Sequence, residues 1–146
     1  MQERINLAKI TPDGYKALLA LEAHLQTTGI EPLHKELIKI RASQINGCAY
    51  CLDMHTKDAR KLGETEQRIY TLNAWRETPF FSAKERAILA LTEEVTLIAG
   101  HVSDETYQNA FNELGEKLLG EVILAICVIN AWNRWAISTH MMPKAS

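Results

Sequence analysis

The sequence predicts an all-α protein. Apolar residues recur at helical spacing along the whole chain, no segment alternates like a half-buried strand, and glycine, proline and capping residues divide the pattern. A length of 146 residues is usual for one domain, so we expect a single domain over residues 1–146. We expect six or seven helices with short connections, over about residues 12–28, 32–46, 48–62, 64–76, 83–99, 104–115 and 116–139.

Proline and glycine bound the first two helices. Thr11-Pro12-Asp13 offers capping residues and a helix-starting proline, and Gly29 can end the first helix. Pro32 opens the second helix, and Asn46-Gly47 is a stop signal that ends it. The third helix therefore begins near Cys48.

Capping residues also mark the later helices. Ser82 and Glu85 have the S-x-x-E spacing of a capping box at the start of the fifth helix. Ser103-Asp104 can cap a short sixth helix that ends near Gly115. The last helix is the longest, and it is broadly hydrophobic from Val122 to Trp135. A helix that is apolar all round must be buried, so we expect part of it to face another subunit of a homo-oligomer.

Composition and charge limit the classes of function. Hydrophobic residues make up 47% of the chain, which is enough for a core and excludes disorder as the main state. With 16 basic and 18 acidic residues, we expect neither a nucleic-acid partner nor binding to an anionic membrane. The chain begins with no signal-peptide pattern, and its longest apolar run, Val122 to Ile129, is far shorter than the ~20 residues of a membrane span. Three cysteines do not make a secreted disulfide scaffold, so we expect a cytoplasmic setting.

One short motif carries the residues of a redox-active dithiol. Cys48 and Cys51 form a C-x-x-C at the start of a predicted helix, and His55 follows four residues later. At 100° per residue, the three side chains fall within about 60° on one helix face, and the two thiols can form a disulfide with local adjustment. The first turn of a helix favours a thiolate, and His55 can accept a proton or stabilise the thiolate as an imidazolium.

Two other interpretations of the cysteines remain open. The pair can be a buried structural feature, since free cysteine is among the most buried residue types. A structural zinc site needs four ligands, so Cys127 or Glu36 would have to join Cys48, Cys51 and His55. Cys127 itself lies in an apolar run, and we expect it in the core. We expect no bound metal and no cofactor.

Glu36 is a candidate partner of His55. It lies near the edge of the apolar face of the second predicted helix, beside Leu33 and Leu37. A carboxylate there can orient His55 or relay its proton, although the pattern alone favours a solvated glutamate. Asp58, three residues after His55, competes for this role from a more exposed face.

The set of Glu36, Cys48, Cys51 and His55 resembles the active-site motif of the alkylhydroperoxidase D-like proteins, which belong to the carboxymuconolactone decarboxylase superfamily. The resemblance covers roughly residues 11–136, with eleven residues between Glu36 and the C-x-x-C. The flanking matches are Ile45-Asn46-Gly47, Asp53-Met54, Ala59, Gly63-Glu64 and Asn130-Ala131-Trp132-Asn133-Arg134.

The resemblance implies an all-helical domain that assembles as a dimer, trimer or hexamer and reduces hydroperoxides. By the family's pattern, Cys51 attacks the peroxide and becomes a sulfenic acid, and Cys48 then closes a disulfide. Glu36 and His55 form the proton relay. An external dithiol, such as a lipoyl domain or a thioredoxin-like protein, restores both thiols by exchange. The decarboxylase branch lacks this dithiol, so decarboxylation is not expected.

Tyr50 is a departure from part of the family. Some peroxidase members carry a second histidine at this place, whereas tyrosine is common in shorter members. We expect Tyr50 either to line a substrate entrance or to pack. Asn133 and Arg134 are expected to cap a neighbour or to pair across an interface, with Glu36 or Asp58 as partners. We expect core or interface positions for Trp75, Trp132 and Trp135, and surface or core positions for His24, His34, His101 and His140.

The leading interpretation is a thiol-dependent peroxidase that acts on organic hydroperoxides through Cys51 and Cys48. The first alternative is a non-enzymatic redox sensor or interaction module whose assembly responds to the Cys48–Cys51 disulfide. The second alternative is a zinc-stabilised domain. Peroxide-dependent turnover separates the first two interpretations, and metal content separates the third.

Overall fold

The computed structural model describes residues 2–144, and no strand occurs within that range, which confirms the predicted all-α class. Two of its elements, η1 and η2, are short 3-10 helices. The elements in order are α1 (Leu7–Ile10), α2 (Pro12–Leu25), α3 (Pro32–Asn46), α4 (Ala49–Lys61), α5 (Glu66–Tyr70), η1 (Leu72–Glu77), α6 (Ala83–Thr96), η2 (Ile98–Gly100) and α7 (Asp104–Thr139).

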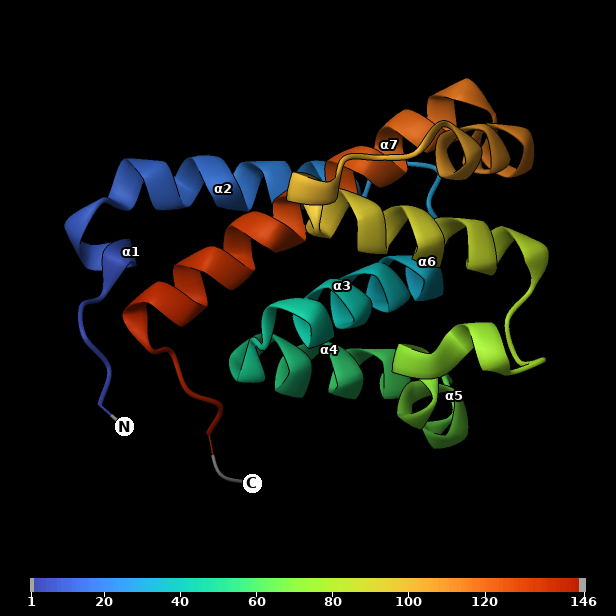
Figure 1. Cartoon of the computed structure of the whole chain (residues 1–146). Coiled ribbons are helices and arrows are strands. Elements are labelled where there is room, and N and C mark those ends of the chain that lie inside the picture. The colour runs from blue at the N-terminus through green and yellow to red at the C-terminus, as the bar shows by residue number, and fades with distance from the viewer. Residues whose placement is uncertain (1, 145–146) are drawn as a thin grey trace.

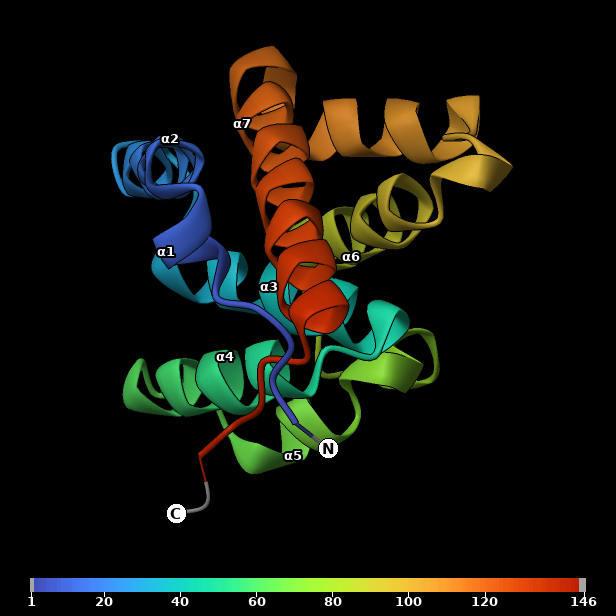
Figure 2. The same cartoon turned by 90° about the vertical axis from the view of Figure 1, so that its left-hand side faces the viewer.

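Helix α3 lies at the centre of the fold. It packs against α4, α6 and α7, and Figure 1 shows it between α4 on one side and α6 on the other. In the view of Figure 2, the C-terminal half of α7 stands beside α3, with α2 on its outer flank. The buried residues of α3 include Lys35, Glu36 and Lys39, so this helix carries charged groups into the interior.

Several helix ends form as predicted. The Oγ of Ser82 accepts the N–H of Glu85 at 3.2 Å, and Oε2 of Glu85 accepts the N–H of Ser82 at 2.7 Å, which completes the capping box. Gly47 adopts a φ of 72° at the end of α3, a conformation that glycine reaches without steric cost. Gly115, with a φ of 74°, divides α7 into the two helical parts that the sequence predicts.

The helices predicted from the sequence differ from those of the structure in two places. Residues 64–76 do not form one helix, because Ala74 leaves helical geometry (φ −119°, ψ 28°) and the segment becomes α5 followed by η1. Helix α1 was not predicted. It has four residues, too few for a recognisable apolar period, and the side chain of Asn6 caps it by accepting the N–H of Lys9.

The expected core position of Cys127 is also wrong, because its side chain is exposed. The inner stripe of α7 consists of Val122, Ile126 and Ile129, at spacings of four and three residues. Position 127 is rotated by about 100° from Ile126, on the side of the helix that carries exposed Arg134. The predicted subunit contact of α7 stays a prediction.

None of the helices within residues 2–144 combines the length and the apolar character that a membrane crossing requires.

Candidate active site

The C-x-x-C pair sits where α3 turns into α4. Gly47 reverses the chain, and Cys48 becomes the N-cap residue of α4, with its Sγ accepting the N–H of Cys51 at 3.3 Å. The Cα atoms of Cys48 and Cys51 are 5.4 Å apart, and their sulfurs are paired as a disulfide. Both side chains are buried. The predicted placement of both cysteines in the first turn is therefore correct.

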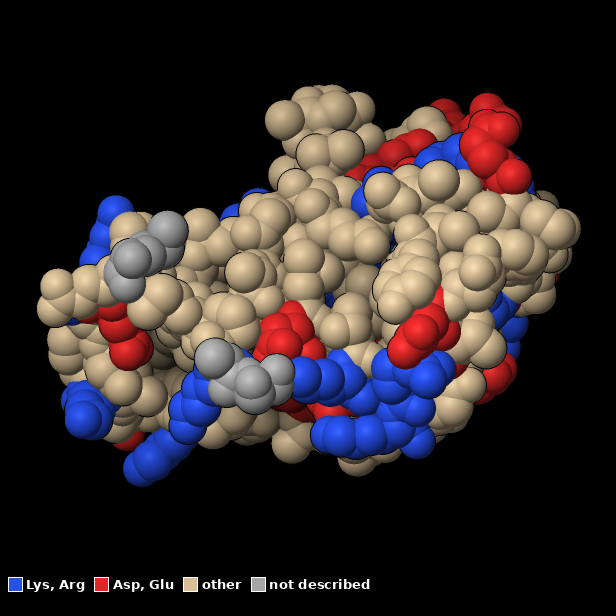
Figure 3. Space-filling view, turned by 90° about the horizontal axis from the view of Figure 1, so that it is seen from below, with Lys and Arg blue, Asp and Glu red and all other residues tan. Residues whose placement is uncertain are grey.

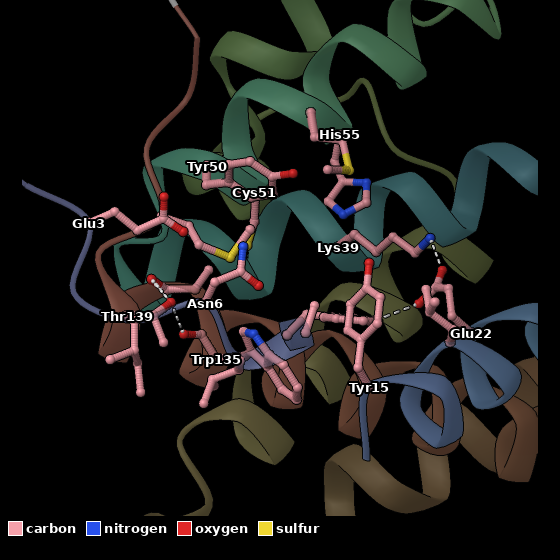
Figure 4. Close-up of a pocket in the computed structure, with 18 of the residues that line it drawn as sticks. Glu3, Asn6, Tyr15, Glu22, Lys39, Tyr50, Cys51, His55, Trp135 and Thr139 are labelled. Atoms are coloured by element: carbon pink, nitrogen blue, oxygen red, sulfur yellow. Dashed lines mark hydrogen bonds and ion pairs between the residues drawn. The ribbon is translucent and has the colours of Figure 1, made fainter. Parts of the chain in front are cut away.

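Cys51, rather than Cys48, opens into a cavity of about 450 Å³. His55 lies one turn further along α4 and lines the same cavity. Figure 4 shows Cys51 and His55 projecting from α4 toward the same space, which Tyr15 of α2 and Trp135 of α7 bound from the other side. Small molecules that enter this cavity meet the sulfur of Cys51 beside an imidazole.

Glu36 holds the ring of His55 from the neighbouring helix. Its Oε2 lies 2.9 Å from Nδ1 of His55, and the side chains of Glu36 and His55 are only 11% and 12% exposed. The solvated glutamate that the pattern favoured is therefore wrong, because the packing of α4 on α3 covers this edge of the apolar face. A carboxylate that accepts Nδ1–H leaves Nε2 as the nitrogen free to take a proton.

Lys39, which is buried, and Glu22, which is partly exposed, extend this contact into a chain of charged side chains. Nζ of Lys39 lies 3.7 Å from Oε1 of Glu36 and 2.6 Å from Oε1 of Glu22 on α2. The other oxygen of Glu22 accepts the indole N–H of Trp132 at 3.1 Å. Sequence reasoning missed both residues. The only local signal was the three-residue spacing of Glu36 and Lys39, which places them on one helix face.

Aromatic side chains form one wall of the cavity. The ring of Tyr15 lies 6.0 Å from that of Trp132 and 5.8 Å from that of Trp135, measured between centroids. Tyr50 also lines the cavity, next to Cys51 in the chain, and its role at a substrate entrance stays a prediction. Trp75 is buried in the core as expected, whereas Trp132 and Trp135 border the cavity.

The two ends of the described chain lie beside the cavity. Glu3 and residues 5–8 contribute to its lining, as do Thr139 and Met141. The N–H of Arg4 donates to the carbonyl of Thr139 at 2.9 Å, and its guanidinium donates to the carbonyl of Ser138 at 3.1 Å. These hydrogen bonds tie the N-terminal segment to the end of α7.

Asp58 lies near the relay but has a second partner. Glu36, His55 and Asp58 each place one possible ligand atom within 4.8 Å of the others. Among residues 2–144, this is the group of side chains that could hold a metal ion. Asp58 also pairs with Lys61 at 2.9 Å on the surface of α4. The four-ligand zinc site with Cys48 and Cys51 is not formed, because the two sulfurs are joined to each other.

The surface around α4 carries both basic and acidic side chains. Figure 3 views the molecule from below and shows basic side chains next to acidic ones. Two ion pairs on α4, Lys57 with Asp53 at 2.8 Å and Lys61 with Asp58 at 2.9 Å, belong to this mixture.

Within residues 2–144, Asn133 and Arg134 form no hydrogen bond or ion pair with Glu36 or Asp58, and their pairing across an interface stays a prediction. Asn133 is fully buried, where its Oδ1 accepts from Nδ2 of Asn46 at 2.8 Å and its Nδ2 donates to Ser43 at 3.0 Å. Arg134 donates to the carbonyl and side-chain oxygens of Asn130. Asn133 thus ties α7 to the end of α3, just before the C-x-x-C turn.

The fold and the site define a class of protein, an all-helical chain that presents a C-x-x-C cysteine to a cavity beside a buried His–Glu pair. The chain belongs to the carboxymuconolactone decarboxylase family, whose model matches residues 12–94. That range contains Glu36, Cys48, Cys51 and His55.

Known proteins resemble the chain over nearly its whole length. It is 46% identical over 139 residues to the uncharacterized protein YdfG of Bacillus subtilis, covering 94% of this chain and 95% of YdfG. A solved structure from Agrobacterium tumefaciens, a protein of unknown function described as a candidate antioxidant defence protein AhpD, is 38% identical with a TM-score of 0.96, covering 99% of this chain and 100% of that one. The debrominase Bmp8 is similar in fold alone, at 20% identity with a TM-score of 0.85, over 94% of this chain and 74% of Bmp8.

Proposed function

We propose that the protein is a thiol-dependent peroxidase that reduces organic hydroperoxides at Cys51. The observation that carries this proposal is that Cys51 opens into the cavity while His55, held by Glu36, lines the same space. The resemblance to AhpD-like proteins in fold and motif supports the same chemistry.

In the first step the thiolate of Cys51 attacks the terminal oxygen of the hydroperoxide. The O–O bond breaks, the sulfur gains one oxygen to become a sulfenic acid, and the alkoxide takes a proton from the relay to leave as an alcohol. His55 supplies that proton from its Nε2 side, and Glu36 stabilises the imidazolium that precedes the transfer.

In the second step Cys48 resolves the sulfenic acid. The thiol of Cys48 attacks the sulfur of Cys51, a disulfide forms and water leaves. The distance of 5.4 Å between their Cα atoms allows this disulfide without a large movement of the backbone. An external dithiol then reduces the disulfide by exchange and is itself oxidised to a disulfide. We propose a protein-borne dithiol, of the lipoyl or thioredoxin-like kind, as this donor.

The mainly aromatic and apolar lining of the cavity supports an organic hydroperoxide rather than hydrogen peroxide as the better substrate. We also propose that the chain works in the cytoplasm as a homo-oligomer of two to six subunits. The mixed surface charge around α4 supports neither a nucleic-acid nor a membrane partner.

Steady-state turnover tests this proposal. The protein, reduced by dihydrolipoamide or by a thioredoxin system, is expected to convert many equivalents of cumene hydroperoxide to the alcohol, and Cys51→Ser is expected to convert none. A single turnover followed by arrest, with a change of assembly size, would support the redox-sensor alternative instead. The same assay with 2,3,4-tribromopyrrole tests whether the chain shares the substrate class of the debrominase Bmp8.

A further inference from the structure

We propose that Lys39 is a positioning residue for the proposed thiol chemistry, anchored by Glu22 and holding Glu36 against His55. This inference rests on the proposed function, because it concerns how Cys51 and His55 are kept ready to react. Neither Lys39 nor Glu22 belongs to the C-x-x-C motif or to its His–Glu pair.

Burial makes Lys39 unusual. Its side chain is only 7% exposed, and lysine is rarely buried unless a carboxylate accompanies it. Lys39 has two such partners, with its Nζ at 2.6 Å from Glu22 and at 3.7 Å from Glu36. The ammonium group therefore joins a carboxylate of α2 to the carboxylate that orients His55.

The two carboxylates differ in what fixes them. Glu22 is held on its second oxygen by the indole N–H of Trp132, so it is a firm anchor for the ammonium. The remaining contact of Glu36 is to His55, through the other carboxylate oxygen. Lys39 therefore attracts the oxygen of Glu36 that His55 does not use, and this charge contact favours the orientation in which the other oxygen faces His55.

Charge balance supports the same role. Lys39 is the cation that lies within ion-pair distance of both Glu22 and Glu36, so it offsets the negative charge of both carboxylates next to His55. A protonated His55 can then pair with Glu36 on one side and stabilise a Cys51 thiolate on the other. Without Lys39, the negative charge of Glu22 and Glu36 is no longer offset and disfavours a thiolate on Cys51. Glu36 is then a buried carboxylate without an adjacent lysine, and it orients His55 less firmly.

Lys35 provides a matched control on the same helix. It is also a buried lysine of α3, and burial lowers the pKa of its amine. Glu22, Glu36 and Lys39 act on the amine of Lys35 through their charges, but no carboxylate of residues 2–144 lies within ion-pair distance of its Nζ, and Lys35 does not line the cavity. Lys35→Met therefore removes a buried α3 lysine without touching the contact to Glu36.

The test measures the reactivity of Cys51 directly, in a background with Cys48→Ser and Cys127→Ser so that one thiol remains. The second-order rate of alkylation by iodoacetamide at neutral pH is expected to fall about tenfold in Lys39→Met, since one unit charge beside a titrating group commonly changes its ionisation by a factor of this size. Lys39→Arg, which keeps the charge, is expected to retain most of the rate. Lys35→Met leaves the ion pair of Glu36 in place and is expected to lower the rate much less than Lys39→Met does. Glu22→Gln, which removes the anchor but keeps a buried lysine, is expected to lower the rate about threefold.

An unchanged alkylation rate in Lys39→Met would overturn the inference, and so would an equal fall in Lys35→Met. Circular dichroism checks that each variant is folded, and if Lys39→Met does not fold, Lys39→Arg and Glu22→Gln decide the question by the same rates. The peroxidase assay separates this inference from the proposed function. If the parent protein turns over no peroxide, the proposed peroxidase function is contradicted. If the alkylation rate of Cys51 still depends on Lys39 in that case, the positioning role of Lys39 is retained.

Discussion

Oε2 of Glu36 lies 2.9 Å from Nδ1 of His55, although the two residues come from different helices, nineteen positions apart in the chain. The packing of α4 on α3 creates this contact, and it orients the imidazole toward the cavity that Cys51 lines. Proton transfer at the site depends on this pair, because a histidine without a fixed tautomer and orientation is a poor proton donor or acceptor.

Glu36→Gln is expected to lower kcat/KM for cumene hydroperoxide by about 100-fold, the usual contribution of a positioned acid–base group. Glutamine keeps the shape of the side chain but loses the charge that stabilises the imidazolium. Glu31→Gln is the control, because Glu31 precedes the same helix, its side chain is 59% exposed and it pairs with Lys84. Equal activity of Glu36→Gln and Glu31→Gln would remove Glu36 from the relay.

Tyr50→Ala is expected to lower kcat/KM for cumene hydroperoxide about tenfold while leaving the rate with hydrogen peroxide unchanged. The lost aromatic contact with a bulky substrate accounts for an effect of this size. Tyr70→Ala serves as the control, since Tyr70 is 71% exposed on α5. An equal loss with both peroxides would mean that Tyr50 supports the site rather than the substrate.

Glu93→Gln is expected to lower the free energy of unfolding by about 2 kcal/mol at pH 7, because it breaks a partly buried ion-pair cluster with Arg41 and Arg76. Burial alone raises the pKa of Glu93, but hydrogen bonds from Arg76, Trp75 and Arg41 outweigh it, so the pKa lies below its usual value. A lowered carboxyl pKa stabilises the fold above the unfolded-state pKa, and this stability is lost as pH falls through the folded-state pKa.

Urea unfolding of the parent and of Glu93→Gln at several pH values checks that prediction. The difference between them is expected to be largest above about pH 5 and to shrink toward pH 3. Glu113→Gln, at an exposed position of α7, is expected to change little at any pH. A constant difference across this range would contradict the assignment of the stability to the ionised carboxylate.

Cys127 is expected to react with a thiol reagent in the folded, oxidised protein, because its side chain is exposed while Cys48 and Cys51 are joined. Titration under native conditions is expected to find one thiol, and to find two more after reduction. Cys127→Ser is expected to abolish the first signal and to leave peroxide consumption unchanged. A native protein with no reactive thiol would indicate instead that a subunit contact covers this side of α7.

The sequence predicted the class of fold and the site motif because both depend on local spacing. The capping box at Ser82, the stop at Gly47 and the shared face of Cys51 and His55 follow from positions a few residues apart. The nearness of Glu36 to His55 was proposed as one option, and resemblance to a family supported it.

Contacts between helices distant in the chain could not be predicted in this way. The anchoring of Lys39 by Glu22 depends on how α2 meets α3, and the exposed position of Cys127 depends on which stripe of α7 faces inward. Periodicity identifies the apolar stripe of one helix but not the neighbour that it meets. The 3-10 segment at Ala74 is set by tertiary packing rather than by any local breaker residue.

The reaction of Cys51 with peroxide is tested most directly by counting thiols after one equivalent of peroxide. Reduced Cys127→Ser protein, which has two thiols, is treated with one equivalent of cumene hydroperoxide and then titrated. Both thiols are expected to disappear as a Cys48–Cys51 disulfide forms. In this background, Cys48→Ser is expected to stop at a sulfenic acid on Cys51, whereas Cys51→Ser is expected to keep its thiol and leave the peroxide intact. Consumption of peroxide by Cys51→Ser at the parent rate would contradict the central role of Cys51.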